Sequence, residues 1–172
     1  MRNALFAERF NIVTGVPADS QGAGGLAVPA INMKDVARAT LVLIKNTGTA
    51  GDDPTITFTQ GDGISSGALT NGKALTVVAR ADTKRHASAI PTTWTKETQA
   101  AAATFTSLTL AEEKGVIAID ITPDMLDVAN DFYAVRAAVA DTGSAGAQLG
   151  VLFWIIEPKS MPPLSVEADA SN

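Results

Sequence analysis

One loop occurs twice in this 172-residue chain, and it constrains the fold more than any other feature. Residues 46–51 read Asn-Thr-Gly-Thr-Ala-Gly, and residues 141–146 read Asp-Thr-Gly-Ser-Ala-Gly. Glycine, Asn, Asp and small hydroxyl residues reverse the chain direction, because they tolerate positive φ angles and satisfy backbone groups locally. Apolar, strand-like runs flank the two copies, at residues 41–44 and 55–59 and at residues 133–139 and 149–156. Two such strand–loop–strand units predict an antiparallel β protein.

Further runs show the spacing of strands. Residues 55–59 alternate strictly, which places Ile56 and Phe58 toward a core and the threonines outward. Residues 117–121 alternate in the same way, with three isoleucines on one face, and the continuous apolar run at 40–44 predicts a strand covered on both faces. Weaker strand patterns occur at residues 10–13, 75–79 and 105–110. Seven or eight strands joined by Gly-, Asp- and Ser-containing loops predict an all-β fold, either an antiparallel β-sandwich or a jelly roll.

One short helix is predicted between two of these strands. Thr122 offers a hydroxyl at the N-cap, Pro123 suits the first helical position, and Asp124 places an acid in the first turn. We expect this helix to run to about Ala129. Residues 98–103 are compatible with a helix but too short to assign.

The two ends of the chain differ from its middle. Residues 15–29 are rich in Gly, Ala, Ser and Pro, and the sequence after residue 157 brings prolines and an acidic end. Such segments are poor core formers and become ordered only against something else. The predicted organisation is an extended N-terminal arm (1–30), one β-sandwich domain (31–157) and an extended C-terminal tail (158–172).

Charge and hydropathy argue against several kinds of partner. The net charge is −5, whereas nucleic-acid binders carry a basic patch that neutralises phosphates. The tight basic cluster Lys84-Arg85-His86 is interpreted as a solvated loop between strands. The apolar run 149–156 is far shorter than the roughly 20 residues of a membrane helix, and residues 1–13 do not resemble a secretory signal. We expect a soluble protein made in a cytoplasm, with no nucleic acid and no membrane among its partners.

The sequence shows no arrangement of residues suited to catalysis. His86 is the only histidine and cysteine is absent, so a nucleophile–base pair would have to use that one residue. Asp52, Asp53 and the Gly-Asp-Gly of residues 61–63 offer oxygen ligands for calcium, but they lack EF-hand spacing and match the residues that turns use. The prediction is therefore that the chain is not an enzyme and has no catalytic residue, no metal site and no cofactor.

Two features keep a functional alternative open. Asp124, Asp127 and Asp131 fall at i, i+3 and i+7, which aligns them on one face if the helix extends that far. Such carboxylates perform acid–base work or hydrolyse glycosides, or they form the solvated face of the helix. Trp94 lies between threonines in a loop-like region and fits an interface, a packed position or a sugar-binding platform. Trp154, inside the most apolar strand, is predicted to lie in the core.

Five segments of the chain carry a family resemblance. They are residues 10–17, residues 41–60 with the core Asn-Thr-Gly-Thr-Ala-Gly-Asp-Asp-Pro, residues 95–101, residues 117–131, and residues 135–150 leading into the last strand. Together they resemble a group of small structural proteins of tailed bacteriophages and prophages. The resemblance covers most of residues 9–158 as a pattern of loops and strands and includes no catalytic signature.

The resemblance implies a β-rich virion component, above all a capsid cement or decoration protein. Such proteins bind the outer face of a phage shell and stabilise contacts between capsomers. The implied partners are the major capsid protein and further copies of the chain in a homo-oligomer, and the implied location is the virion. A head–tail connector, tail or fibre-base component is the alternative within the particle, and a carbohydrate-binding β-sandwich is the alternative outside it. The acidic charge and the terminal arms agree with an outer layer held by many weak contacts.

Overall fold

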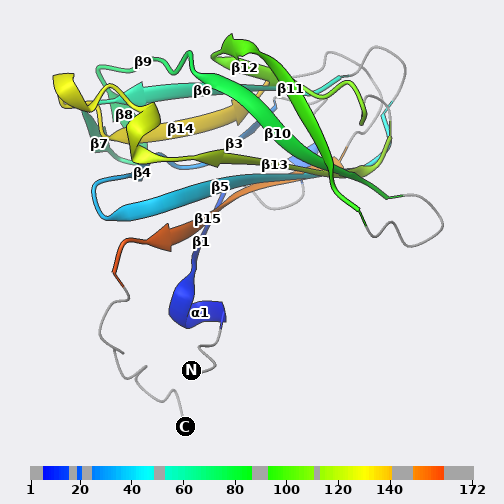
Figure 1. The fold of residues 1–172 in the computed structure, drawn as a ribbon, viewed down its shortest axis with the longest axis horizontal. Coiled ribbons are helices and arrows are strands. Elements are labelled where there is room, and N and C mark those ends of the chain that lie inside the picture. Colours follow the sequence, from blue (N-terminus) through cyan, green and yellow to red (C-terminus); the bar gives the residue numbers. More distant parts are fainter. Residues whose placement is uncertain are drawn as a thin grey trace, which may run out of the picture.

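The computed structural model describes residues 6–15, 19–20, 25–48, 53–86, 93–110, 113–140 and 149–160. Strands make up 60% of the structure and helical turns 6%, and the sheets are antiparallel, which confirms the all-β prediction. Figure 1 shows the two main sheets as layers, with β6 and β14 in one and β5 and β15 in the other. The arrangement is that of a β-sandwich, and jelly-roll connectivity stays a prediction.

The larger sheet has the strand order β1-β15-β5-β13-β10-β11, and β2 also pairs with β15. Its strands are β1 (Asn11–Thr14), β2 (Asp19–Ser20), β5 (Val36–Lys45), β10 (Val78–Arg85), β11 (Thr95–Ala102), β13 (Gly115–Ile121) and β15 (Leu149–Pro158). The smaller sheet has the order β12-β6-β14-β3, with β4 beside β14 and β9 beside β6. Its strands are β3 (Leu26–Ala27), β4 (Ile31–Asn32), β6 (Thr55–Gly61), β9 (Lys73–Ala74), β12 (Thr104–Thr106) and β14 (Ala134–Val139).

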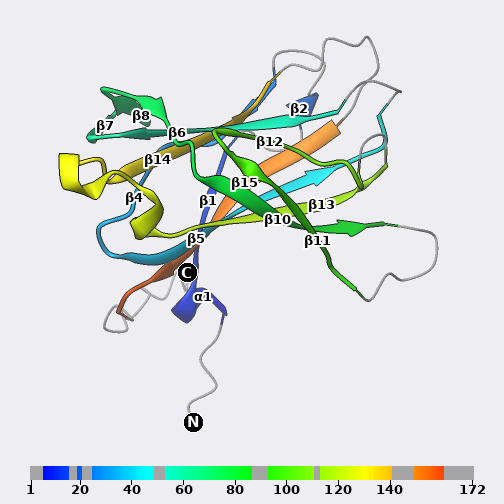
Figure 2. The same cartoon turned by 45° about the horizontal axis from the view of Figure 1, so that its top comes forward.

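A separate two-stranded hairpin is formed by β7 (Gly63–Ser65) and β8 (Ala68–Thr70). Its turn places Ser66 and Gly67 at φ angles of 50° and 77°, and the glycine adopts this left-handed backbone without steric cost. Figure 2 shows the hairpin at the end of the sandwich where the short turns after β13 also lie. The hairpin extends one end of the sandwich and contacts β6 and β14 there, with Leu69 beside Gly61.

The two copies of the repeated loop connect the sheets to each other. β5 and β6, which flank the first loop, belong to different sheets, and so do β14 and β15, which flank the second. β5 pairs with β15, while β6 pairs with β14, so the two strand–loop–strand units lie side by side. Backbone bonds join them beside the loops, from Asn46 N to Leu149 O (2.9 Å) and from Ala140 N to Thr55 O (3.3 Å). Residues 49–52 and 141–148 of these loops lie outside the described residues.

The alternating patterns identify the core correctly. Ile56 and Phe58 of β6 are buried, and so are the three isoleucines of β13. Trp154 is completely buried, as predicted. These side chains form one core cluster with residues of both sheets, including Leu41 and Leu43 of β5. The second face of β5 is less covered than predicted, since Val42 is buried but Ile44 is 45% exposed.

The predicted helix is replaced by two short 3-10 turns, Pro123–Met125 and Val128–Asn130. The first turn begins after Thr122 as expected, and the Thr122 N–H donates to the Met125 Sδ at 3.5 Å. Leu126 then adopts an extended backbone, with φ −89° and ψ 157°, and its side chain is buried. Core packing of Leu126 thus ends the helix before Ala129.

Three strand boundaries differ from the prediction. The 75–79 run becomes a strand only from Val78, and the 105–110 run only over Thr104–Thr106. Residues 95–102, part of which is compatible with a helix, form β11 at the edge of the larger sheet. Pairing with β10 outweighs the helix propensity of its alanines, because strand formation depends on neighbours.

Part of the predicted arm is built into the sandwich. The short strand at residues 11–14 pairs with β15, and β3 pairs with β14. Leu26 and Val28 are buried in the core, so residues 25–30 have more to bury than their composition indicated. A four-residue helix, α1 (Phe6–Arg9), precedes β1. At the other end, Pro158 still belongs to β15, and residues 161–172 lie outside the description.

Candidate functional site: the outer face of the larger sheet

The side of the larger sheet that faces away from the core is apolar over four neighbouring strands. The register places these side chains next to one another, because Phe153 pairs with Val42 and Val42 with Ala118. Ile44 likewise lies between Val151 and Val116 in the neighbouring row. We call this set the outer face; it consists of Ile12, Val42, Ile44, Val116, Ala118, Val151, Phe153 and Ile155.

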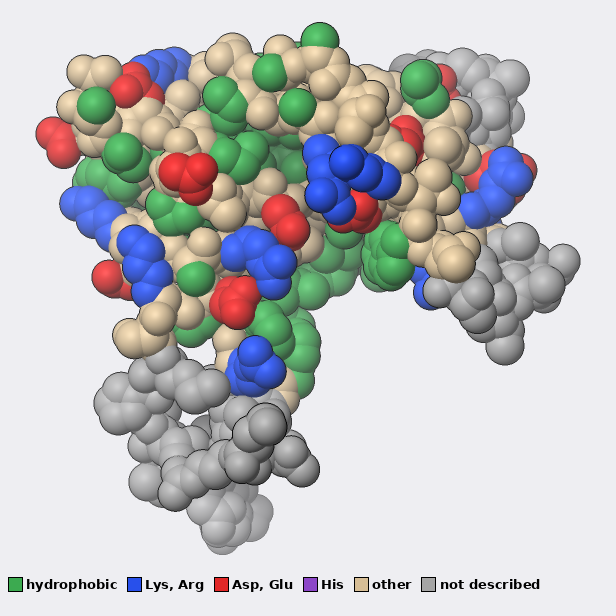
Figure 3. Space-filling view, viewed as in Figure 1, with side chains coloured by type: hydrophobic (Ala, Val, Ile, Leu, Met, Phe, Trp, Pro, Cys, Tyr) green, Lys and Arg blue, Asp and Glu red, His purple; other side chains and the backbone are tan. Residues whose placement is uncertain are grey.

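This apolar surface is accessible in the described structure. Ile12 and Ile44 are 47% and 45% exposed, and apart from the buried Val42 the other members are half-buried. Figure 3 shows hydrophobic side chains gathered on the lower side of the molecule, below a band of charged ones. Antiparallel sheets with one solvated face normally alternate apolar and polar residues, so an apolar outward side is unusual and indicates a contact surface.

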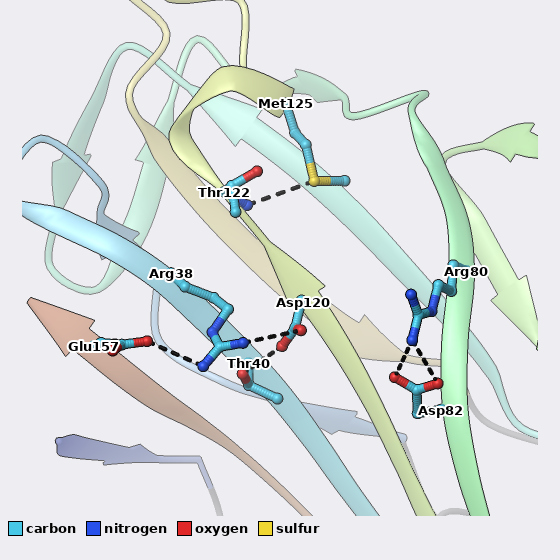
Figure 4. A network of polar contacts seen from close by, with 8 residues as sticks. All are labelled: Arg38, Thr40, Arg80, Asp82, Asp120, Thr122, Met125 and Glu157. Carbon is cyan, nitrogen blue, oxygen red and sulfur yellow. Dashed lines mark hydrogen bonds and ion pairs between the residues drawn. The ribbon is translucent and has the colours of Figure 1, made fainter. Parts of the chain in front are cut away.

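Charged side chains border the outer face. The Arg38 guanidinium bridges two neighbouring strands, 3.0 Å from the Glu157 carboxylate and 3.6 Å from that of Asp120 (Figure 4). The Thr40 hydroxyl donates to Asp120 at 2.5 Å. We call this border the charged rim; its members are Arg38, Arg80, Asp82, Lys84, Lys96, Asp120 and Glu157. The Arg80 guanidinium donates to both oxygens of Asp82 at 3.0 Å, so the ion pairs hold the side chains of the rim in place.

An open hollow of about 380 Å³ continues the outer face toward the start of β15. Ile44, Val116 and Leu149 supply apolar walls, and Leu149 is 47% exposed. Lys114 and His86 lie at its margin. His86 is exposed, and its backbone N–H donates to the Lys114 carbonyl at 2.9 Å. None of the described residues that line the hollow is a carboxylate, serine, threonine or cysteine that could form a catalytic pair with His86.

Trp94 lies at the edge of the same surface, directly before β11. Its side chain is 51% exposed, which rules out a core role, and the Lys84 Nζ lies 5.9 Å from the ring centroid. Lys84 and Arg85 belong to β10, and Arg85 pairs with Glu113 at 3.1 Å. The interpretation of the basic cluster as a loop is therefore wrong for its first two residues, because β10 continues through Arg85 to pair with β13.

The three aspartates at helical spacing do not share a face. The extended Leu126 separates Asp124 from Asp127, and Asp131 adopts a left-handed backbone at φ 62°. Asp127 accepts hydrogen bonds from Lys73 (2.5 Å) and from Asn130. These hydrogen bonds, with that from Lys73 foremost, lower the pKa of the Asp127 carboxyl, so this side chain stabilises a turn.

The Gly-Asp-Gly turn at residues 61–63, which offered oxygen ligands for calcium, has its carboxylate hydrogen-bonded within the chain. Asp62 accepts hydrogen bonds from Asn71 (2.6 Å) and Thr70 (2.8 Å), which lower the pKa of its carboxyl. Asp53 is exposed, and Asp52 lies outside the described residues. Over the described part of the chain, no group of three or more potential ligands is placed to hold a metal ion.

Two buried charged residues were missed by sequence reasoning. Lys45 is 3% exposed, and its Nζ donates to the carbonyls of Leu110 (2.7 Å) and Glu113 (2.6 Å). Glu97, 9% exposed, accepts hydrogen bonds from the Ser107 hydroxyl (2.7 Å), the Leu108 N–H (2.9 Å) and the Thr109 hydroxyl. Strand alternation is the signal that could have found Lys45, since it follows the inward-facing Leu41 and Leu43 at intervals of two.

Comparisons of the chain with protein-family models, with curated proteins and with solved structures give no match. Within the described ranges, none of the helices has the length and apolar character needed to cross a membrane. The outer face and its charged rim are therefore the features on which a functional argument can be built.

Proposed function

We propose that this protein is a non-enzymatic structural component of a tailed-phage particle, specifically a capsid cement or decoration protein on the outer face of the shell. The proposed partners are the major capsid protein and further copies of the chain. The virion assignment rests on the family resemblance described above. The observation that carries the association role is the apolar outer face bordered by ion pairs.

The polar side chains support a structural role. Glu97, Asp62 and Asp127 are hydrogen-bonded by neighbouring side chains of the same chain, in arrangements that link strands and turns. The outer face, in contrast, presents apolar surface that a soluble monomer rarely exposes over so many neighbouring residues. The most conspicuous surface is therefore one suited to association.

The charge of the chain supports a place away from packaged DNA. The net charge of −5 repels phosphate, and an acidic protein on an outer layer avoids this cost. Within the particle, a head–tail connector, tail or fibre-base component is the alternative, since it would use the same fold in few copies. Copy number separates the two.

The test is quantitative mass spectrometry of purified particles, with the major capsid protein as the internal standard. We expect a copy number comparable to that of the capsid subunit. About a dozen copies or fewer would replace the cement proposal by a ring or spike at the tail axis. Absence from the particles would overturn the virion proposal.

The exposed Trp94 favours a second candidate, a carbohydrate-binding β-sandwich, because an exposed indole next to a cation suits a sugar platform. Binding of the purified protein to a glycan array measures this directly. No binding by the unaltered protein would exclude this candidate, and retained binding in the Trp94→Ala variant would exclude Trp94 as the sugar platform.

A further inference from the structure

We propose that the outer face and its charged rim form the contact between two copies of this chain, related by a twofold axis. This inference deepens the proposed function by naming the surface through which copies of the chain meet, but it concerns the purified protein and holds or fails without reference to a particle. The partner that covers the outer face is a second copy of the same chain.

The size of the surface fits a stable dimer. Six neighbouring strands, from β1 to β11, each offer up to four outward positions, as β5 does with Arg38, Thr40, Val42 and Ile44. With strands about 4.8 Å apart and outward residues about 6.8 Å apart, the surface measures at most roughly 29 Å by 27 Å, or about 800 Å². A standard interface buries about 800 Å² on each partner. Its anatomy is also that of an interface, with an apolar centre and a charged border.

The distribution of apolar residues selects the direction of the axis. The apolar strands β1, β15, β5 and β13 lie at one side of the sheet, and the charged strands β10 and β11 lie at the other. When all six strands overlap, an axis parallel to the strands would place apolar side chains on the partner's charged ones. An axis that crosses the strands places β5 on β5 and β15 on β15. Two sheets with the same twist then pack aligned at about −30°.

The charges of the rim permit this contact. Arg38 is paired with Asp120 and Glu157, and Arg80 is paired with Asp82. Lys84 and Lys96 add positive charge, so the rim is close to neutral although the chain has a net charge of −5. Two copies can therefore meet through this surface without strong repulsion between like charges.

Sedimentation equilibrium on the purified full chain is the first test. We expect the apparent mass to rise from 17.7 kDa toward twice that value with concentration. Ile44→Glu places a charge in the apolar centre and should raise the dimer dissociation constant about a hundredfold. Because Ile44 is 45% exposed, the variant should keep the unaltered circular dichroism and melting temperature. Leu108→Glu is the matched control, since Leu108 is 86% exposed and lies outside the outer face; it should leave the dissociation constant unchanged.

Cysteine cross-linking tests the axis itself, and the absence of native cysteine keeps the experiment clean. Ala118 lies midway along the outer face, in the row of Val42 and Phe153, so two copies of it approach each other across the axis. Because packed sheets lie about 10 Å apart, too far for a direct disulfide, a short bismaleimide is the cross-linker. It should convert Ala118→Cys to a covalent dimer on a denaturing gel and leave Leu108→Cys monomeric.

Three results would overturn the proposal. The first is a monomer at every concentration, and the second is a dimer whose affinity Ile44→Glu does not change. The third is a monomeric protein whose binding to isolated shells is lost in Ile44→Glu, which would assign the outer face to the shell. None of these depends on the copy number in particles, so this inference and the proposed function are tested separately.

Discussion

Glu97 links the edge of the larger sheet to the segment that follows β12 of the smaller sheet. It lies on the edge strand β11 and points inward, where its carboxylate binds donors of residues 107–109, just after β12 of the other sheet. Burial raises the pKa of the Glu97 carboxyl, but the hydrogen bonds from Thr109, Ser107, Leu108 and Thr83 outweigh it, and the pKa lies below its ordinary value. The charged form is therefore the one that stabilises the fold.

Removal of this carboxylate should destabilise the protein. Glu97→Ala leaves the donors of residues 107–109 without their acceptor, and we expect a loss of about 3 kcal/mol in the free energy of unfolding, measured by urea titration. Glu113→Ala is the control, because the Glu113 side chain forms an exposed ion pair with Arg85, and the substitution keeps the backbone carbonyl that accepts from Lys45. Equal effects of the two substitutions would show that the inward carboxylate has no special role.

The same residue predicts how stability depends on pH. The lowered folded pKa means that the unfolded chain binds the proton first as pH falls, so the contribution of Glu97 is complete above the ordinary value of 4.5. It is lost as pH falls through the lower folded pKa. In melting experiments between pH 6 and pH 3, Glu97→Gln should show a smaller fall in melting temperature than the unaltered chain. A parallel fall in both proteins would contradict the assignment.

At the scale of elements, β1 is the part of the predicted arm that supports the sandwich. It pairs with β15 over four residues, and Val13 packs against the core. Gly15 follows it in close approach to β3, where an added Cβ would lie 2.2 Å from the Ala27 carbonyl oxygen. A larger residue at position 15 would therefore push β1 away from β3.

Two truncations separate this structural part from the residues before it. Deletion of residues 1–9 leaves β1 intact and should keep the melting temperature. Deletion of residues 1–14 removes Val13 and the pairing partner of β15, and should cost about 2 kcal/mol in the free energy of unfolding. Loss of stability already in the shorter deletion would place the contribution in residues 1–9 instead.

Across the whole molecule, strand pairing joins segments that lie far apart in the sequence. Arg38 on β5 binds Glu157 on β15, 119 positions later in the sequence, and these two strands lie side by side along most of their length. Long loops must close before such contacts form, so folding of sandwiches of this kind is slow.

We expect refolding of the full chain to take milliseconds to seconds after dilution from denaturant, followed by tryptophan fluorescence. Trp154 is a suitable probe because it is completely buried in the core, and Trp94→Phe removes the exposed second signal. Completion within microseconds would contradict the inferred dependence on non-local pairing.

The local patterns determined the class of fold and most of the core. Strict alternation at residues 55–59 and 117–121 predicted which side chains are buried, because the pleat turns every second side chain to the same side of a strand. The repeated loop marked two chain reversals. The sequence also suggested turn roles for Asp62, which the hydrogen bonds of this residue support.

Only the tertiary structure decided which strands became neighbours and which surfaces remained open. Pairing of β5 with β15 and of β6 with β14 depends on packing between segments far apart in the chain, which no local pattern encodes. That pairing brings Ile44, Val42 and Phe153 together on the outward side, and burial of Leu126 breaks the predicted helix. Local periodicity gives the direction of each side chain relative to its own strand. The candidate site, in contrast, depends on which strands are neighbours in the larger sheet.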